Sequence, residues 1–421
     1  MKYDKQAVYF FIATLFLMVG MACNMNLFAS AVTSTPTAIN TVPTFPPTTT
    51  QVSVQPSATR LPPTAPPVAQ NTRPQINTSS PTHMPVVLLL TTGKGILGDI
   101  YAWDMASLAL KQLTSWGYNF APRISPDGQW LAYLSVSRAA VTAMKQGQAM
   151  NAERLANIWL INPYTEEAVR VADQPQNEAV QSGNLITRTD PVWSPDGTSL
   201  AWIDSDIHGE RLAIYTQASQ ATAMFSLNLP PACCEGGYRT LYWGHSGIAI
   251  LGNEGTPPTQ VKQVVYVFSP KGVQLARAEL SVDFSPQYGW ITYNGHEYLG
   301  GPTNGELTLV DPFNTSPIVA QGYPEMYSLS ASNELSVHPA KNPVLWTITR
   351  QGETLTDIND IQNPQNISVA PDGKGIVYSQ GNDADGGKLF AYLASGQTVP
   401  ITPQMRVLAV TWGATGWRIH P

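Results

Sequence analysis

Acidic side chains close to glycine are the residues of this sequence with the most evident chemical potential. Asp204-Ser-Asp206 and Asp383-Ala-Asp385-Gly386 each place two carboxylates two positions apart. Paired carboxylates can bind Ca²⁺, and pairs of Asp or Glu carry out glycoside hydrolysis. The further oxygen ligands that Ca²⁺ needs are not evident in either segment. Solvated turns are therefore the simpler interpretation, and the sequence predicts no metal site.

No recognisable catalytic motif accompanies these acids. The Gly-x-Ser-x-Gly sequence that marks the nucleophile of α/β-hydrolases is absent, and Gly244-His-Ser-Gly247 is a turn by comparison with the repeats described below. The six His are isolated, and none stands at zinc-ligand spacing from the three cysteines. We therefore expect no cofactor and no enzymatic activity. A glycosidase or lyase that uses acidic residues such as Glu235 and Glu297 is kept as the alternative.

Two adjacent cysteines, Cys233 and Cys234, lie in the loop Pro230-Pro-Ala-Cys-Cys-Glu-Gly-Gly237. Outside the cytoplasm such a pair can close a tight vicinal disulfide that stiffens its loop. A redox function is the weaker interpretation, because no Cys-x-x-Cys motif is present.

Aromatic and polar residues in the presumed loops form a candidate binding face. Aromatic rings beside polar groups suit sugars and peptide segments, although packing of the loops themselves explains such residues equally well. The candidate residues are Trp116, Tyr118, Asp204, Asp206, His208, Glu235, Tyr238, His296, Tyr298, Tyr323, Asp383 and Asp385.

The composition indicates a β-rich chain. Of the 421 residues only 12% are charged, whereas 32 are Gly, 35 are Pro, 11 are Trp and 17 are Tyr. Turn-forming and aromatic residues in such numbers favour strands with frequent reversals. The net charge of −6 and the scattered basic residues exclude nucleic acid as an expected partner.

The N-terminus predicts export. Lys2 and Lys5 precede an apolar stretch from Ala7 to Ala22, and Cys23 follows at once. Gly20-Met-Ala-Cys23 resembles the signal of bacterial lipoproteins, which implies lipidation at Cys23. An uncleaved helix over Ala7–Val32 and simple secretion remain alternatives. Each places the protein outside the cytoplasm, and the first two anchor residues 1–30 in the membrane.

Residues 31–84 predict an unfolded linker. Pro and Thr occupy 24 of its 54 positions, and no apolar periodicity is present with which a face could be buried. Such a segment stays extended, so it would hold residues 85–421 away from a membrane.

After residue 84 a hairpin repeat appears. A large apolar residue is followed by Ser-Pro-Asp-Gly, in which Pro fixes φ and Gly accepts a conformation closed to other residues, and then by a second strand. Asp127, Asp196 and Asp372 are therefore turn residues and poor catalytic candidates. The three clear copies are Ile124–Tyr133, Trp193–Trp202 and Val369–Tyr378, and the weaker ones are Trp243–Gly247, Phe284–Tyr293, Val337–Trp346 and Trp412–Gly416.

This unit resembles the PD40 repeat of the TolB-like β-propellers. The resemblance implies an all-β fold of about seven four-stranded blades over residues 85–421, with six blades left open. It also implies engagement of envelope proteins, although TolB's N-terminal α/β domain has no counterpart here. Asp99–Asp104 and Leu110–Thr114 look like outer strands whose inner strand is Val407–Trp412, so the two chain ends would close the ring. Either Val86–Leu90 or Trp417–His420 would supply the remaining strand.

In such a ring the hairpin turns lie on one face, and the second-to-third-strand loops and blade-to-blade connections lie on the other, the long-loop face. Ser137–Ala156 is an insertion on this face that is rich in helix-forming residues, so we expect a short helix over the channel mouth. A surface excursion with no role is the alternative. Taken together, the sequence predicts a membrane-tethered binding or scaffold protein of the cell envelope. Its ligand would be a protein or peptide, with a glycan as the second choice.

Overall fold

The computed structural model describes the chain from Val86 to Ile419 with gaps, and all of these residues lie in the second of two compact units, Leu61–Pro421. The described residues are 86–91, 97–104, 107, 109–146, 155–175, 185–230, 239–255, 261–280, 284, 286, 289–293, 295–303, 306–314, 317–319, 326–328, 336–339, 346–350, 353–358, 368–369, 375–380, 388–393, 395–401, 405–411 and 417–419.

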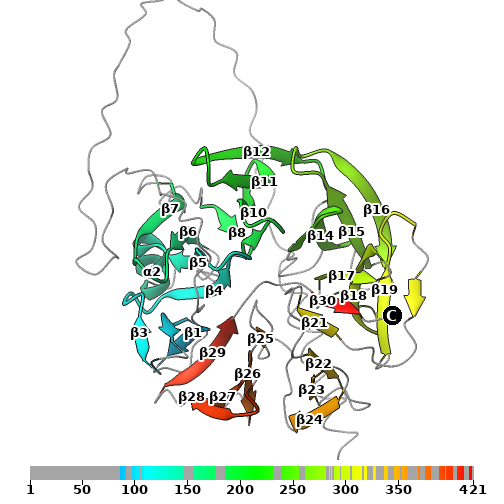
Figure 1. The fold of residues 1–421 in the computed structure, drawn as a ribbon. Coiled ribbons are helices and arrows are strands. Elements are labelled where there is room, and N and C mark those ends of the chain that lie inside the picture. The colour runs from blue at the N-terminus through cyan, green and yellow to red at the C-terminus, as the bar shows by residue number, and fades with distance from the viewer. Residues whose placement is uncertain are drawn as a thin grey trace, which may run out of the picture. The chain divides into compact units, whose positions relative to one another are not determined.

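Strands that follow one another along the chain form antiparallel four-stranded units (Figure 1). Blade 2 shows the pattern. It runs from β4 (Asn119–Ile124) through β5 (Leu131–Val136) and β6 (Ala156–Ile161) to β7 (Ala168–Ala172), and each strand pairs with the next. The helix α2 (Arg138–Lys145) lies between β5 and β6, as the insertion predicted.

The other blades keep this order. Blade 1 contains β1 (Val86–Thr91), β2 (Asp99–Trp103), β3 (Leu110–Gln112) and β29 (Arg406–Thr411); blade 3 contains β8 (Thr187–Arg188), β9 (Val192–Trp193), β10 (Ser199–Asp206), β11 (Gly209–Thr216) and β12 (Ala221–Leu227); blade 4 contains β13 (Thr240–Gly244), β14 (Gly247–Glu254), β15 (Lys262–Phe268) and β16 (Gln274–Leu280).

Blades 5 and 6 are joined into one nine-stranded sheet by β30 (Trp417–Ile419), which pairs with the first strand of each. Blade 5 contains β17 (Gly289–Tyr293), β18 (His296–Thr303), β19 (Glu306–Val310) and β20 (Pro317–Val319); blade 6 contains β21 (Met326–Ser328), β22 (Ser336–Pro339), β23 (Trp346–Arg350) and β24 (Glu353–Ile358); blade 7 contains β25 (Ser368–Val369), β26 (Gly375–Gln380), β27 (Lys388–Leu393) and β28 (Thr398–Ile401).

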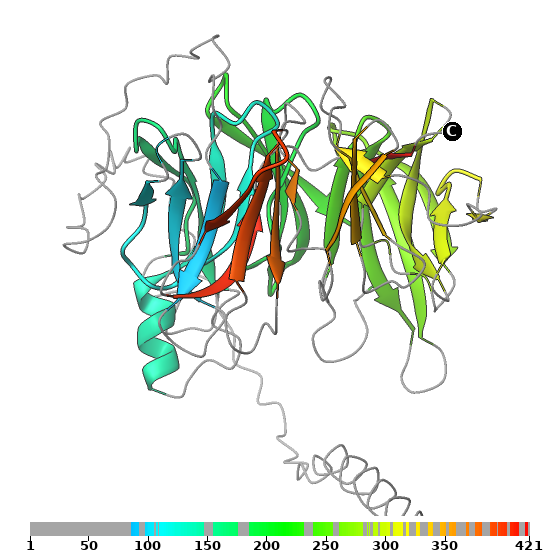
Figure 2. The same ribbon diagram turned by 60° about the horizontal axis from the view of Figure 1, so that its bottom comes forward.

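The described strands thus make seven blades, and Figures 1 and 2 show them arranged side by side around an axis. The predicted all-β propeller of about seven blades is confirmed. The ring closes as expected, because β29 from the chain end pairs along β1. Val86–Thr91 therefore supplies the strand that the sequence left open, while β30 adds to blades 5 and 6 instead.

The Ser-Pro-Asp-Gly segments form tight turns, as predicted, through hydrogen bonds within the segment and a positive φ at Gly. In the first copy the Ser125 hydroxyl donates to Asp127 Oδ1 at 2.5 Å, and Gly128 N donates to the Ser125 carbonyl at 2.8 Å. Gly128 has φ 70°, and Gly197 in the second copy has φ 72°. Asp196 likewise accepts from the Ser194 hydroxyl at 2.6 Å. Both aspartates are therefore turn residues, whereas Asp372 lies outside the described residues.

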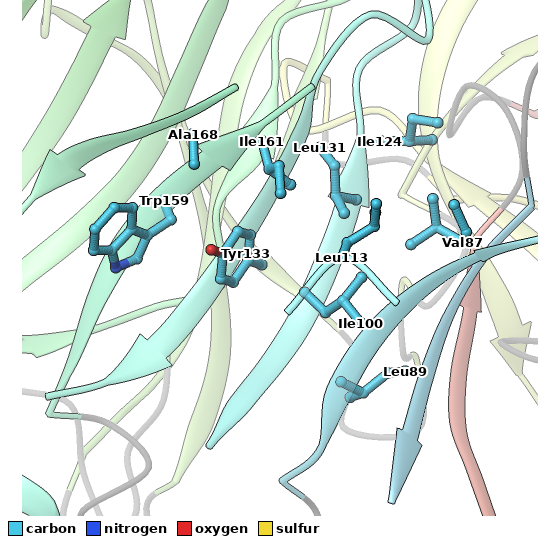
Figure 3. Packing of buried hydrophobic residues seen from close by; sticks show 11 residues of the cluster. Val87, Leu89, Ile100, Leu113, Ile124, Leu131, Tyr133, Trp159, Ile161 and Ala168 are labelled. Carbon is cyan, nitrogen blue, oxygen red and sulfur yellow. The ribbon is translucent and has the colours of Figure 1, made fainter. Parts of the chain in front are cut away.

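The core consists of apolar layers between successive blades. Figure 3 shows the layer between blades 1 and 2, where Ile100 and Leu89 meet Leu131 and Tyr133. Comparable clusters join blades 2 and 3, 3 and 4, 4 and 5, and 7 and 1. The sheets of blades 1 to 4 are therefore stabilised mainly by burying both of their faces against their neighbours.

Tryptophan indoles also join the inner strands of neighbouring blades. The Nε1 of Trp193 in blade 3 donates to the carbonyl of Arg123 in blade 2 at 2.8 Å. The Nε1 of Trp290 in blade 5 donates to the carbonyl of Tyr242 in blade 4 at 3.2 Å. These bonds fix how far one blade is displaced along the next.

Blade 5 differs from the sequence prediction. The segment Phe284–Tyr293 was expected to form a hairpin. Instead β17 is the first strand of blade 5, and its hairpin partner is β18. Tyr293 pairs with His296 across the two-residue loop Asn294-Gly295, and Gly295 has φ 78°. Gln287-Tyr288 replaces Asp-Gly in this copy, whereas Asn-Gly suits a two-residue hairpin loop well. The copy at Val337–Trp346 does form a hairpin, but between the second and third strands of blade 6.

No helix among the described residues is long and apolar enough to cross a membrane. The predicted signal, the Cys23 lipidation site and the Pro/Thr linker lie outside these residues.

Replacing Trp193 with Phe tests the inter-blade indole bond. We expect Trp193→Phe to lower the free energy of unfolding by about 1 kcal/mol, because the ring stays and the bond to the Arg123 carbonyl is lost. Urea unfolding followed by circular dichroism measures this. Trp130→Phe, in the preceding turn, is the control and should cost less. Equal losses from both variants would contradict the assignment.

Candidate functional site

The long-loop face of blades 1 to 3 is the part of that face described in most detail. Four segments meet there: the β1–β2 connection, the β3–β4 connection, α2 and the connection from β7 to β8. Leu97, Trp116, Tyr118 and Leu185, one or two from each connection, pack against the buried side of α2. Ala140 and Val141 supply that side, being 0% and 5% exposed. The helix is therefore a docked part of the domain rather than a free excursion. Figures 1 and 2 show it below blade 2, near the outside of the ring rather than over its centre.

Trp116, Tyr118 and Arg138 form a connected group at the edge of α2. The two rings lie 5.1 Å apart at a tilt of 47°, and the Arg138 guanidinium lies 5.7 Å from the Trp116 ring centre. Trp116 Nε1 donates to the Val136 carbonyl at 3.0 Å, so the indole is held in place. Both rings are half-buried, while Arg138 is exposed. The result is a rigid aromatic and cationic edge, which can contact a ligand at little entropic cost.

Asp204 is buried and paired with Arg188. It is 5% exposed, and its Oδ1 accepts from Arg188 Nε at 2.9 Å and from Trp202 Nε1 at 2.7 Å. Arg188 also donates across to blade 2, to the carbonyls of Ala156 at 2.7 Å and Asp173 at 2.8 Å. This predicted candidate thus forms a structural ion pair within blade 3, whose arginine also bonds to blade 2, and it has no open side for a ligand.

Asp206 holds the turn between β10 and β11. Its carboxylate accepts from Arg211 at 2.6 Å and from the His208 backbone N–H at 2.8 Å. The Arg211 hydrogen bond lowers the pKa of Asp206 below its ordinary value. Its charge therefore stabilises the fold above pH 3.8, and this contribution is lost as the pH falls through the lowered pKa. His208 is exposed beside it, next to Ile207, which is 67% exposed.

Two further polar groups repeat the arrangement of Arg188 at neighbouring interfaces. At the start of blade 4, Arg239 donates to Glu210 of blade 3 at 2.9 Å and to the Pro230 carbonyl at 2.7 Å. Its guanidinium lies against Gly252, where any side chain would collide with it. At the start of blade 2, the Asn119 amide donates at 3.1 Å to Gly98 O and to Asp99 Oδ1, both in blade 1.

The long-loop end of the inner strand thus carries a buried polar residue in blades 2, 3 and 4. These residues were not among the predicted site residues. The arginine placed four or five positions before the strand-ending Trp193 and Trp243 was a signal that could have found two of them.

His296 and Tyr298 lie on the opposite face from the one predicted. They begin β18 at the turn next to Asn294, so they belong with the hairpin turns. The neighbouring Glu297 accepts from the backbone N–H groups of His245 and Ser246, at 3.1 and 2.6 Å. These two residues form the corresponding turn of blade 4. This difference arises because the hairpin of blade 5 lies between Tyr293 and His296. β18 therefore begins at the hairpin-turn face, and His296 and Tyr298 lie near that end of the strand.

The remaining candidates lie outside the described residues: Cys233, Cys234, Glu235, Tyr238, Tyr323, Asp383 and Asp385. Within the residues described, no group of three or more His, Cys, Asp or Glu comes together in a way that could hold a metal ion.

Comparison with known proteins was made by sequence and by structure. No family model matches the sequence, and no curated protein matches it. Among solved structures, the chain is similar to TolB from Acinetobacter baumannii at 13% identity and a TM-score of 0.42, over 78% of this chain and 66% of TolB. It is also similar to the β-propeller domain of the Trilobed protease from Pyrococcus furiosus at 14% identity and a TM-score of 0.44, over 72% of this chain and 87% of that domain.

A third similar structure is the acylaminoacyl peptidase from Pyrococcus horikoshii, at 11% identity and a TM-score of 0.42, over 68% of this chain and 46% of that one. The chain thus spans just under two thirds of TolB and less than half of the peptidase. The strand pairing described above makes the chain a seven-bladed β-propeller protein.

Arg188→Met tests the buried ion pair of blade 3. We expect a loss of about 3–5 kcal/mol in the free energy of unfolding, because the Asp204 carboxylate would be left buried without its cation. Arg211→Met, which breaks the more exposed pair with Asp206, should cost at most about 1 kcal/mol. Urea unfolding compares the two.

The double variant R188M/D204M removes both charges, so it should recover part of the loss. If Arg188→Met lowers the free energy of unfolding no more than R211M does, the Arg188–Asp204 pair does not stabilise the fold as proposed.

Proposed function

We propose that this protein is a membrane-tethered, non-catalytic binding or scaffold propeller that recognises a protein or peptide with its long-loop face. The observation that carries the proposal is the docked helix α2 with its aromatic and cationic edge. Three connections pack against this one helix, and binding surfaces are commonly built from loops on a rigid scaffold.

The exposed side of α2 has the character of a protein-contact surface. Arg138, Thr142 and Lys145 follow one another at intervals of four and three residues, so they share one side of the helix. With the half-buried Trp116 and Tyr118 at its margin, this side combines aromatic anchors with basic groups. Such a combination suits an extended or helical segment bearing acidic residues.

The carboxylates described on this face argue against the glycosidase or lyase alternative. That chemistry needs one carboxyl group with a raised pKa and a second one that is free to act as nucleophile or base. Asp204, Asp206 and Glu210 are each paired with an arginine, at 2.9, 2.6 and 2.9 Å. Burial does raise the pKa of Asp99, but its Oδ1 already accepts hydrogen bonds from Gly117 N and Asn119 Nδ2.

The tether is proposed from the sequence of residues 1–84. The basic start, the apolar stretch and the small residues before Cys23 support an exported, anchored protein. The Pro/Thr-rich segment that follows would let the propeller reach a partner at a distance from the membrane.

Cys23→Ala separates the two kinds of anchor. If Cys23 is lipidated, intact-mass analysis of the full-length protein from membranes gives a mature chain that begins at Cys23 and carries added lipid. The Cys23→Ala variant cannot carry this lipid, so it would either retain its uncleaved signal or be released from the membrane. If residues 7–32 form an uncleaved helix, the variant keeps the mass and membrane fraction of the native chain. Release of the native chain into the soluble fraction would refute both forms of tether.

A photo-crosslinking residue placed at Thr142 tests the binding face. Thr142 is exposed on α2, and the equally exposed Thr198 lies in a hairpin turn on the other face, so it is the matched control. In the native cells, we expect a discrete protein adduct of the full-length chain from position 142 and none from position 198. Trp116→Ala should reduce the adduct at 142 severalfold.

The outcomes are distinguishable by immunoblot and by the mass of the adduct. Adducts from both positions at equal yield, or from 198 alone, would contradict a ligand site on the long-loop face. Retention of the 142 adduct in the Trp116→Ala variant would remove the aromatic edge from the site while leaving the face in place.

A further inference from the structure

The outer strands of the blades are the exposed edges of their sheets, and all but one of those described are protected. An unpaired edge strand invites pairing with another chain, and charged residues or Pro on the edge prevent it. The described outer strands with such protection are β3 (Lys111), β7 (Arg170), β16 (Arg277 and Glu279), β20 (Pro317), β24 (Glu353 and Asp357) and β28 (Pro400).

The outer strand of blade 3, β12, has neither a charged residue nor a proline. β12 reads Ala-Thr-Ala-Met-Phe-Ser-Leu over Ala221–Leu227, with no charge and no Pro. It pairs with β11 along all seven of these positions on one side, and it has no described strand on its other side. Figure 1 shows it along the outer margin of the ring. Its length is sufficient for pairing with a further strand.

The surroundings of β12 leave this edge open. The first four residues of the strand are exposed, so neither neighbouring blade covers them. Met224 is 43% exposed, and Val273 on the adjacent β15–β16 turn is 59% exposed. Phe225 connects the two, because its ring lies directly against Gly272 of that turn. An exposed apolar surface therefore adjoins the unprotected edge.

We propose that β12 is an interface at which two copies of this chain join by antiparallel edge-to-edge pairing. The inference does not depend on the proposed function. A pair centred on Met224 is related by a two-fold axis and places Ala223 opposite Phe225 and Ala221 opposite Leu227. Each large side chain then meets a small one, and no like charges are brought together. This self-complementarity favours a second copy over an unrelated peptide.

The first test compares two lysine variants of the full-length chain in detergent solution. Met224→Lys charges β12 at the axis, and Leu110→Lys charges β3, whose Leu110 is 40% exposed. We expect the native chain and L110K to form a reversible dimer in sedimentation equilibrium. M224K should weaken the dimer by at least roughly tenfold, because two lysines would face each other. Because residues 1–85 are the same in all three proteins, association through that part would persist in M224K.

The second test fixes the register. In the proposed pair the two copies of residue 224 are about 5 Å apart, so Met224→Cys should give a disulfide-linked dimer under mild oxidation. The copies of residue 226 are roughly 14 Å apart, so Ser226→Cys should not. A mixture of Thr222→Cys and Ser226→Cys chains should form only the mixed dimer.

A native chain that stays monomeric, an M224K variant that dimerises like L110K, or equal cross-linking at 224 and 226 would each overturn the proposal. If M224K has the same urea unfolding midpoint as L110K, destabilisation of the fold is excluded as the cause of the weaker dimer. Failure of the photo-crosslinking at Thr142 would leave these results unaffected.

Discussion

The sheets of blades 1 to 4 are apolar on both faces, so none of these blades could be stable without its neighbours. Leu131 and Tyr133 of blade 2 pack toward blade 1, while Ala132 and Leu134 of the same strand pack toward blade 3. This strict alternation follows from the two-residue period of a strand. A chain built in this way must continue until its last blade meets its first, and the pairing of β29 with β1 is the consequence. Closure thus protects the first and last sheets from exposing an apolar face.

Apolar layers alone leave neighbouring sheets free to slide, because hydrophobic contact has little directionality. Polar bonds at both ends of the inner strands remove that freedom. At the hairpin end the indole of Trp193 bonds to a backbone carbonyl of the preceding blade, and the indole of Trp290 makes the corresponding bond from the start of β17. At the long-loop end Asn119, Arg188 and Arg239 reach back in the same direction. Each bond is made to a fixed backbone or ion-paired group, so the apolar layers pack in one register.

The sequence predicted the parts of the fold that depend on neighbouring residues. Ser125-Pro-Asp-Gly128 forms its turn through contacts within the segment itself, and the number of blades follows from counting such units. Blade 5 was misassigned because Phe284-Ser-Pro286 repeats the start of that unit, while the two-residue loop at Asn294 decides the pairing. Because β18 begins at this hairpin, His296 and Tyr298 lie on the hairpin-turn face and not on the long-loop face.

Long-range pairing explains why the candidate site could be predicted only in part. Asp204 looked like an exposed acid because its sequence neighbours are polar, yet its partner Arg188 is supplied by another strand of the same blade and its surroundings by blade 2. Trp116 and Tyr118 were placed on the long-loop face by the order of the strands alone, and their packing against α2 depends on an insertion that no repeat specifies.

The arginines of this face link its stability to its chemistry. Asp204, Asp206 and Glu210 would make the long-loop face acidic if they were free, but Arg188, Arg211 and Arg239 neutralise them. Arg138 and Lys145 on α2 are basic and exposed on this face. A chain with a net charge of −6 thus presents a basic helix on this face. Because Arg188 and Arg239 also bond to the preceding blade, a substitution of either that freed its acid for catalysis would loosen the ring that positions it.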